Sequence, residues 1–313
     1  MFKNRKYLYK DLLFKWSNET LNVKIQTKQR YLRLIKNHCL PYFKDILIKD
    51  ISIDTFIDFI KTENKNQVSV SVQKTLKYIL KSSWEYGVSI NICKPLMFDC
   101  IKFKKNKTKI VVFTKREQLI LEECLKNKIN SRKLAILISL YSGLRIGEVC
   151  ALKWKNIDLE NETILVEKTI IRIEQSNGNE KNKTMLVEST PKSDSSERLI
   201  PLPSFLTKIL QTYKQDENCY IVNGKQKKYD PRQLADTYYR ILKKCGIKKV
   251  KYHTLRHTFA TRCIESKMDI KTLSEILGHS SVEVTLQIYV HPSSDLKKKS
   301  IENMVRFVAE KSS

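Results

Sequence analysis

The chain has 313 residues, of which 41% are hydrophobic and 29% are charged. This balance excludes a wholly disordered protein, and no apolar run approaches the ~18 residues that a membrane span requires. The N-terminal stretch MFKNRKYLYKDLLFKW alternates Lys and Arg with aromatic residues and lacks the apolar core and cleavage site of a signal peptide. The length predicts two domains or one large one.

The charge excess is the most informative property of the composition. The chain has 59 Lys and Arg against 33 Asp and Glu, which gives a formal net charge of +26. The excess is spread along the sequence and is not confined to a tail. A solvated basic surface is the simplest explanation. However, each phosphate that a cation neutralises releases counterions, so a compact body with this charge favours a nucleic-acid partner.

The eight cysteines include no CxxC pair, and most of them stand among apolar neighbours. Such cysteines are usually free, buried thiols and not metal ligands or disulfides. We therefore expect a reducing, cytoplasmic compartment.

Residues 8–100 show the periodicity of helices. One helix over residues 27–43 should stop near Pro41, because proline interrupts helices. A second should follow Ser52, which suits an N-cap, and a third should end at Gly87 as its C-cap. Together they predict a helical domain over residues 1–103.

Residues 104–112 are interpreted as a basic linker, because the stretch KFKKNKTK shows no periodicity and is rich in lysine. A helical domain tethered by such a strap could lie across a duplex as half of a clamp. The lysines expected to contact nucleic acid are Lys102, Lys104, Lys105, Lys107 and Lys109.

The remainder, residues 113–313, predicts helices around a small sheet. Thr114 suits the N-cap of the first helix, and the pattern is helical again from Pro231 onward. Three β-branched runs, ETILVEKTIIRI, TMLVEST and ERLIPLP, are separated by polar turns and predict one three-stranded antiparallel sheet. The expected fold class is mainly α with a small antiparallel β-sheet, an α+β arrangement.

Arg145 and Glu148 stand three residues apart in GLRIGEV, among apolar positions that should be buried. An arginine in such surroundings needs an anionic partner, because an unpaired buried charge is costly. Two explanations stay open: a local helical ion pair with Glu148, and an arginine that binds the anion of a ligand.

The segment HTLRH places His253, Arg256 and His257 at i, i+3 and i+4, on one face of a helix. The arginine fork bonds two oxygens at once, so this face suits a phosphate. The alternative is zinc held by the two histidines, with Cys263 nearby. Because Arg256 would repel a cation and no acidic ligand is obvious, we expect no metal.

Two further stretches carry candidate residues. Lys192 stands at an expected hairpin turn, where a solvated lysine is the simplest explanation. In LGHSSVEVTLQIYVH, Gly278 should end one helix, Ser280 and Glu283 have the spacing of a capping box, and the next helix carries Tyr289. This pattern also fits a helix-turn-helix DNA reader, and Tyr289 by itself could be a core residue.

In order and spacing, these segments resemble the tyrosine recombinase (phage integrase) family. The specific resemblance covers residues 112–300 and implies a catalytic domain over residues 113–313 that ends in a C-terminal helix, while residues 8–100 look like that family's core-binding domain. It rests on Arg145, Lys192, His253, Arg256, His279 and Tyr289. The interval from Arg145 to Lys192 is longer than in compact members, so Lys181 and Lys183 remain alternatives. A separate N-terminal arm-binding domain is not expected.

The resemblance implies that Tyr289 attacks the scissile phosphate and forms a 3′-phosphotyrosyl link. Arg145 and Arg256 would hold the non-bridging oxygens, and Lys192 would protonate the leaving 5′-oxygen. The energy of the phosphodiester stays in the covalent link, so neither ATP nor a metal nor another cofactor is implied.

The same resemblance implies roles for the remaining residues of the site. His253 would be the general base or proton shuttle, and His279 would donate a hydrogen bond to the phosphate. Glu148 would orient Arg145, and His257 would pack and form hydrogen bonds.

The family implies double-stranded DNA with specific attachment or core sites, a tetramer on that DNA, and accessory directionality or DNA-bending proteins, with no membrane partner. The expected setting is integration or excision of a mobile element in prokaryotic cytoplasm, at the nucleoid. A type IB-like topoisomerase, a recombinase that resolves chromosome dimers and a non-catalytic regulator remain alternatives. Residues 300–310 predict an amphipathic helix that packs on its own body or docks on a neighbouring protomer.

Overall fold

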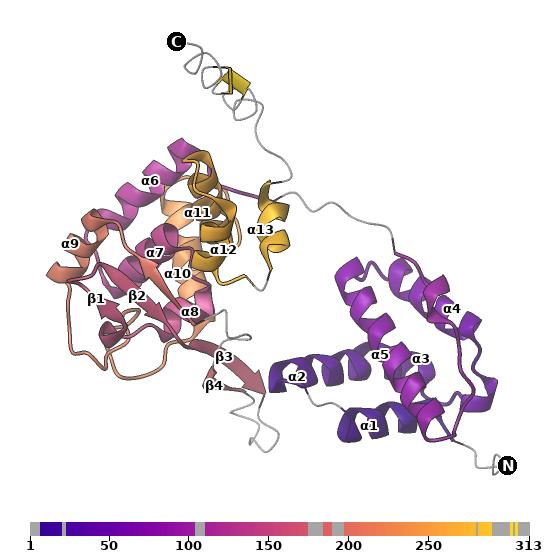
Figure 1. Ribbon diagram of the computed structural model, residues 1–313. Coiled ribbons are helices and arrows are strands. Elements are labelled where there is room, and N and C mark those ends of the chain that lie inside the picture. Colours follow the sequence, from indigo (N-terminus) through magenta and orange to yellow (C-terminus); the bar gives the residue numbers. More distant parts are fainter. Residues whose placement is uncertain are drawn as a thin grey trace. The chain divides into compact units, whose positions relative to one another are not determined.

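The computed structural model describes residues 7–20, 23–103, 110–174, 184–189, 197–279, 281–289, 301–302 and 304–305, with the backbone alone for residues 284 and 287–289. The chain divides into two compact units, Met1–Thr108 and Lys109–Ser313. Figure 1 shows helices in the first unit and helices with short strands in the second. The predicted class, mainly α with a small antiparallel component, is confirmed.

The first unit is built around an aromatic core. The ring of Tyr9 packs edge-on against Phe43 and Phe56, and Phe56 packs in the same way against Trp84. Aromatic side chains bury large apolar areas, so this cluster contributes much of the unit's stability. The helices of this unit are α1 (Tyr9–Glu19), α2 (Ile25–Leu34), the π-helix Ile35–Cys39, α3 (Leu40–Phe43), α4 (Ile53–Lys65) and α5 (Val70–Ser89), with 3₁₀ turns at Ile48–Asp50 and Phe98–Cys100.

Local signals predicted one boundary in this unit correctly and another wrongly. Ser52 is the N-cap of α4, as predicted, and it also forms a capping box with Thr55. Pro41 does not end the helix predicted over residues 27–43, because the chain continues from α2 through a π-helical turn into α3. Pro41 occupies the first turn of α3, where a missing N–H breaks no helical hydrogen bond.

The prediction that Gly87 caps α5 is wrong, since the helix continues to Ser89. Gly87 serves close packing instead: a Cβ at this position would lie 2.8 Å from both Cys93 Sγ and Leu12 Cδ2. Glycine lets the side chains of α1 and of the segment after α5 lie close to the helix backbone here, and a Cβ would force them to shift.

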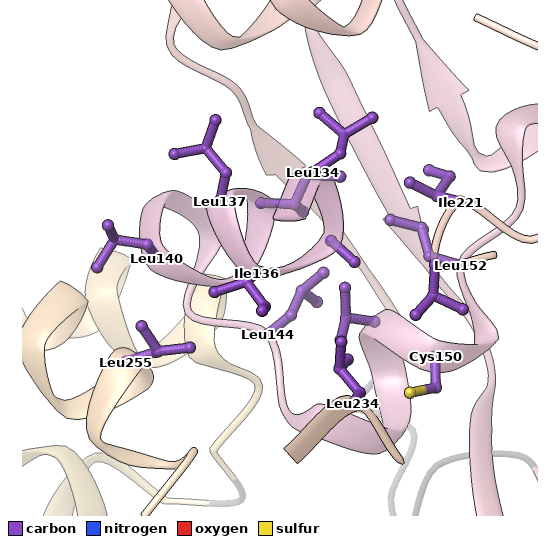
Figure 2. Packing of buried hydrophobic residues seen from close by; sticks show 14 of the residues in the cluster. Leu134, Ile136, Leu137, Leu140, Leu144, Cys150, Leu152, Ile221, Leu234 and Leu255 are labelled. Carbon is purple, nitrogen blue, oxygen red and sulfur yellow. The ribbon is translucent and has the colours of Figure 1, made fainter. Parts of the chain in front are cut away.

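The second unit is organised around the buried helix α7 (Ser131–Ser142). Figure 2 shows Leu134, Leu137 and Leu140 on this helix among side chains from its neighbours, including Leu234 of α10 and Leu255 of α11. Burial on several faces explains why this segment is apolar nearly throughout. The other helices are α6 (Lys115–Lys126), α8 (Ile146–Ala151), α9 (Ser204–Thr212), α10 (Pro231–Lys244), α11 (Thr254–Glu265), α12 (Ile270–Leu277) and α13 (Val282–Tyr289), with a 3₁₀ turn at Trp154–Asn156.

The strands form two small antiparallel sheets, so the prediction of one three-stranded sheet is wrong for the described residues. The first sheet has the order β1-β2-β5, and the second pairs β3 with β4. The run ETILVEKTIIRI splits at Glu167 and Lys168, and its second half pairs with a different partner. The bounds are β1 (Ile157–Asp158), β2 (Thr163–Val166), β3 (Thr169–Glu174), β4 (Thr184–Ser189) and β5 (Arg198–Pro201).

Helix ends in the second unit follow their local signals where the structure describes them. Thr114 caps α6, as predicted, and it forms a capping box with Glu117. Gly278 ends α12 in the left-handed region at φ +61°, also as predicted. Ser280, the predicted N-cap of the next helix, lies outside the described residues.

The cysteines and the C-terminal segment depart in part from expectation. All eight cysteines are free thiols, but Cys100 is exposed and three others are half-buried.

Of the expected helix over residues 300–310, the described residues 301–302 and 304–305 are helical, and Ile301 and Val305 are exposed.

Candidate active site

Three arginines meet at the C-terminal end of α12. Arg198 Nε donates to the carbonyl oxygen of Ile276 at 2.6 Å. Arg256 Nη2 donates to the next carbonyl, Leu277, at 2.6 Å, and Arg145 Nη2 to that of Gly278 at 3.2 Å. The last carbonyls of a helix have no intrahelical donor and carry partial negative charge, so this end of α12 attracts cations.

Glu148 lies between two of these arginines. Its Oε1 accepts from Arg145 Nη1 at 2.7 Å, and its Oε2 accepts from Arg198 Nη2 at 3.0 Å and from the backbone N–H of Arg145 at 2.9 Å. Glu148 is only 4% exposed. Burial by itself would raise the pKa of this carboxyl, but the Arg198 and Arg145 cations outweigh burial and lower it, so Glu148 is ionised at neutral pH.

The arginines differ in accessibility. The side chain of Arg145, the N-cap residue of α8, is 38% exposed, whereas that of Arg198 is 6% exposed. Arg256 is 2% exposed, and its Nη1 also donates to the carbonyl oxygen of Gly143 at 2.9 Å. Burial and the neighbouring Arg145 cation lower the pKa of Arg256 to about 9, which leaves it protonated at neutral pH.

Two histidines lie within the field of these arginines. His253 precedes α11, and its ring packs edge-on against that of His257 at 4.5 Å between centroids. His279 follows Gly278, and its Nδ1 shares a 2.8 Å hydrogen bond with Oγ1 of the buried Thr285. Partial burial and nearby cations lower the pKa of both His253 and His279 to about 4, so both rings are neutral at pH 7.

The turn between α7 and α8 sets the position of Arg145. Gly143 ends α7 with φ +66°, and a Cβ there would lie 2.7 Å from Phe259 and 2.8 Å from Leu277. Gly147 lies equally close to β3, since a Cβ would lie 2.8 Å from the carbonyl oxygen of Ile170. The two glycines of GLRIG therefore let α8 lie against α11, α12 and β3.

The structure brings most of the predicted site residues together. Arg145, Glu148, Arg256 and His279 are linked through the end of α12 and the turn after it, and His253 and His257 adjoin them on α11. His257 packs as expected. Its buried Nδ1 has no hydrogen-bond partner among the described residues.

Other predicted residues cannot be placed in this site. Lys192, Lys181 and Lys183 lie outside the described residues. The expectation that Lys192 stands in a hairpin turn is wrong for the flanking strands, because β4 pairs with β3 and β5 pairs with β2. Tyr289 is the last residue of α13, and its side chain is not described.

The predicted linker lysines are also mostly outside the described residues. Lys104, Lys105, Lys107 and Lys109 fall there, while Lys102 is described and exposed. That the linker lysines contact DNA therefore stays a prediction.

Sequence reasoning missed Arg198, which completes the arginine cluster. The available signal was the run ERLIPLP, where strand alternation places Arg198 on the same face as the apolar Ile200 and Leu202. Arg198 is indeed buried with them at the start of β5, and Glu148 and the Ile276 carbonyl accept hydrogen bonds from its guanidinium.

Two basic cavities lie beside α10. One, of about 570 Å³, is lined in part by Arg132, Arg172, Lys225, Lys227 and Lys228, with Asp230 as an acidic neighbour. The other, of about 510 Å³, is lined in part by Lys128, Arg132, Lys133, Arg240 and Lys244. Clustered cations of this kind suit a polyanionic partner.

Among the described residues, no three side chains of His, Cys, Asp or Glu gather as a metal site would require. Within the same residues, none of the helices combines the length and apolar character needed to cross a bilayer.

The Phage integrase family profile matches residues 112–295, which is more than half of the chain. The chain belongs to the phage integrase family. The profile "Phage integrase, N-terminal SAM-like domain" matches residues 8–63. As a phage integrase family member, the chain is a tyrosine recombinase with DNA strand transferase activity, and DNA recombination is its class of reaction.

Relatives and solved structures agree with this family. A "Tyrosine recombinase XerC-like" protein of Caldanaerobacter subterraneus subsp. tengcongensis is 29% identical, with 94% of this chain and 82% of that protein covered. The Tn1549 transposon integrase in complex with transposon right end DNA has a TM-score of 0.77 at 22% identity, covering 96% of this chain and 100% of that one. A lambda integrase tetramer bound to a Holliday junction has a TM-score of 0.67 at 16% identity, covering 91% and 78%.

Proposed function

We propose that this chain is a site-specific DNA recombinase that cleaves and rejoins DNA through a 3′-phosphotyrosyl link at Tyr289. The observation that carries the proposal is the meeting of Arg145, Arg256 and His279 at the end of α12, directly before the helix that ends at Tyr289. Two guanidinium cations and an imidazole in this arrangement offer a place for a phosphate close to a tyrosine.

In the proposed step, the Tyr289 oxygen attacks the scissile phosphorus and loses its proton, and the bond from phosphorus to the 5′-oxygen breaks. Tyrosine is a poor nucleophile at its ordinary pKa of ~10, so it needs a polarised phosphate. Arg145, whose guanidinium is partly exposed, and Arg256 neutralise the non-bridging oxygens as charge develops.

Two further residues transfer protons, and a third binds the phosphate. His253 is neutral at pH 7 and so can accept the tyrosine proton, directly or through water. The bond between His279 Nδ1 and Thr285 fixes that ring, which assigns Nε2 to the phosphate. We assign protonation of the leaving 5′-oxygen to Lys192.

The covalent link conserves the phosphodiester bond energy. A 5′-hydroxyl of another strand can attack it, which breaks the phosphotyrosyl bond and restores the tyrosine. Strand exchange therefore needs neither ATP nor a metal ion in this proposal. The likeness to a transposon integrase favours a mobile element as the substrate, with a tetramer on two duplexes as the working assembly.

The test is covalent trapping on a nicked duplex that carries the attachment site. The nick lets the short 5′-hydroxyl fragment diffuse away, so the link accumulates. Wild-type protein should give an SDS-stable adduct in EDTA without ATP, and Tyr289→Phe should give none. An adduct with the Phe variant, or a metal requirement, would overturn the mechanism. Relaxation of any supercoiled plasmid without a specific site would favour a topoisomerase instead.

A further inference from the structure

We infer that Arg198 is a positioning residue for DNA cleavage, acting through Glu148 and the Gly278 turn without touching DNA; this rests on the proposed function. Its side chain is 6% exposed, too little to bind a phosphate directly. Arg145, by contrast, keeps 38% of its side chain exposed. Arg145 can therefore reach a phosphate and Arg198 cannot, although both donate to the carboxylate of Glu148.

The first step concerns the rotamer of Glu148. Arg145 Nη1 donates to Oε1 of Glu148, and Arg198 Nη2 donates to Oε2 of the same carboxylate at 3.0 Å. A carboxylate held at both oxygens cannot rotate, so the Arg145 guanidinium that it binds is fixed as well. Without Arg198, Oε2 would lose a charged donor and keep the hydrogen bond from the backbone N–H of Arg145, and the carboxylate could turn.

The second step concerns the turn that carries His279. Arg198 Nε holds the Ile276 carbonyl at 2.6 Å, and its side chain lies across Gly278. A Cβ on Gly278 would lie 3.1 Å from Arg198 Cδ and Nη1, closer than side chains ordinarily pack. The guanidinium thus lies against the residue that precedes His279 and fixes the path of the chain there.

The third step concerns the start of β5. Arg198 is the first residue of this strand and pairs with Val166 of β2. Its guanidinium therefore anchors the beginning of β5 to the end of α12. One guanidinium therefore ties three parts of the proposed site to each other: Glu148 of α8, the end of α12 and the start of β5.

The test compares Arg198→Lys with wild type under single turnover, with DNA limiting and fully bound. Lysine keeps the charge but has no fork to span the Ile276 carbonyl and Glu148. We expect the adduct-forming rate constant to fall about 10- to 100-fold, the size that misplaced catalytic groups produce. The Kd for DNA should stay within about threefold, because the buried side chain contributes little to DNA affinity. Misfolding would lower the amplitude and not the rate constant of the bound fraction.

A double-variant cycle separates positioning from general stability. If Arg198 acts through Glu148, then Arg198→Lys with Glu148→Gln should be no slower than the slower single variant. Arg262→Lys is the matched control, because Arg262 likewise joins a carboxylate, Glu265, to a main-chain carbonyl, Phe113, outside the site. It should keep the wild-type rate constant.

Each outcome decides the matter. A rate constant for Arg198→Lys within twofold of wild type, or a double variant whose loss is the product of the two single losses, overturns the inference. If the lysine variant gives no amplitude, Arg198→Gln is judged by the same criteria, and loss of folded protein in both overturns positioning in favour of a purely structural part. Absence of an adduct with wild-type protein would instead reject the proposed function.

Discussion

At the scale of residues, the site concentrates positive charge that the described side chains only partly neutralise. Arg145 and Arg198 share the carboxylate of Glu148. The three arginines also donate to main-chain carbonyls, those of Ile276, Leu277 and Gly278 at the end of α12 and that of Gly143 at the end of α7. Carbonyl dipoles stabilise a guanidinium without removing its charge. The cluster therefore remains attractive to a phosphate, which would add the missing negative charge.

The same field predicts how His253 and His279 titrate. Burial and neighbouring cations lower both pKa values from 6.5 to about 4, so the folded protein takes up these protons later than the unfolded chain. Their contribution to folding stability is therefore lost as pH falls from about 6.5 towards 4. In NMR titrations of the DNA-free protein, the C2 protons of both rings should not shift between about pH 8 and pH 5.5.

Assignment would use His253→Gln and His279→Gln, each of which removes one resonance. A midpoint near 6.5 for either ring would contradict the description of the site as a cationic cluster.

At the scale of elements, the end of α12 is the feature on which the site depends. It binds the three arginines through successive carbonyls, turns at Gly278 and continues through His279 to α13. A left-handed glycine turn is a common helix ending, but here its peptide also faces Arg198. The turn thus combines a folding signal with a part of the site.

Substitution of two glycines separates those contributions. Gly246 has φ +67° and nothing within 4 Å of a Cβ, so Gly246→Ala should lower the free energy of unfolding by about 1–2 kcal/mol through backbone strain alone. Gly278→Ala, at φ +61°, adds contact with Arg198 and should cost at least about 1 kcal/mol more. Denaturant unfolding measures both. Equal losses, or equal cleavage rates in the two variants, would show that the Arg198 contact is unimportant.

Sequence predicted the elements whose signals are local. Ser52, Thr114 and Gly278 act on backbone groups within four residues, and their predictions are confirmed. Gly87 shows the limit of such signals, because its role depends on Leu12 in another helix.

The candidate site was predictable only as far as its motifs reach. The family resemblance gave Arg145, His253, Arg256 and His279, which the fold brings together. The motifs did not include Arg198, since its partner Ile276 is far along the chain. The alternation of β5, which places Arg198 on the buried face with Ile200, was the one local signal for it. The division into two sheets was equally hidden, because Glu167 and Lys168 are ordinary strand-edge residues.

At the scale of the whole molecule, part of the excess of Lys and Arg behind the net charge of +26 is clustered. The two cavities beside α10 gather lysines and arginines from α7, α10 and the segment before α10. Cations concentrated in this way bind phosphates with release of counterions, so binding should weaken steeply with salt.

We expect Lys227→Gln with Lys228→Gln to weaken DNA binding and to reduce the slope of log Kd against log salt by about 2. Both lysines are exposed and line the larger cavity. Lys208→Gln with Lys214→Gln is the matched control, since these lysines are exposed and outside both cavities. Titrations at several salt concentrations measure the slopes, and equal slopes in the two double variants would refute a DNA contact at the cavity.

The C-terminal segment bears on assembly. The side chains of Ile301, Met304 and Val305 are exposed. Exposure of an apolar helix face to water costs free energy and is typical of a helix that docks on a partner. Deletion of residues 300–313 should leave DNA binding intact and impair strand exchange, if the segment docks on a neighbouring protomer. Gel-shift and recombination assays measure the two activities, and unchanged strand exchange would reject docking in trans.

The most direct measurement is identification of the residue joined to DNA. Trypsin digestion of the trapped adduct should release residues 272–297, in which Tyr289 is the one tyrosine. Mass spectrometry should find this peptide carrying a 3′-phosphonucleotide on Tyr289. A nucleotide on any other peptide, or on a serine of this one, would contradict the account.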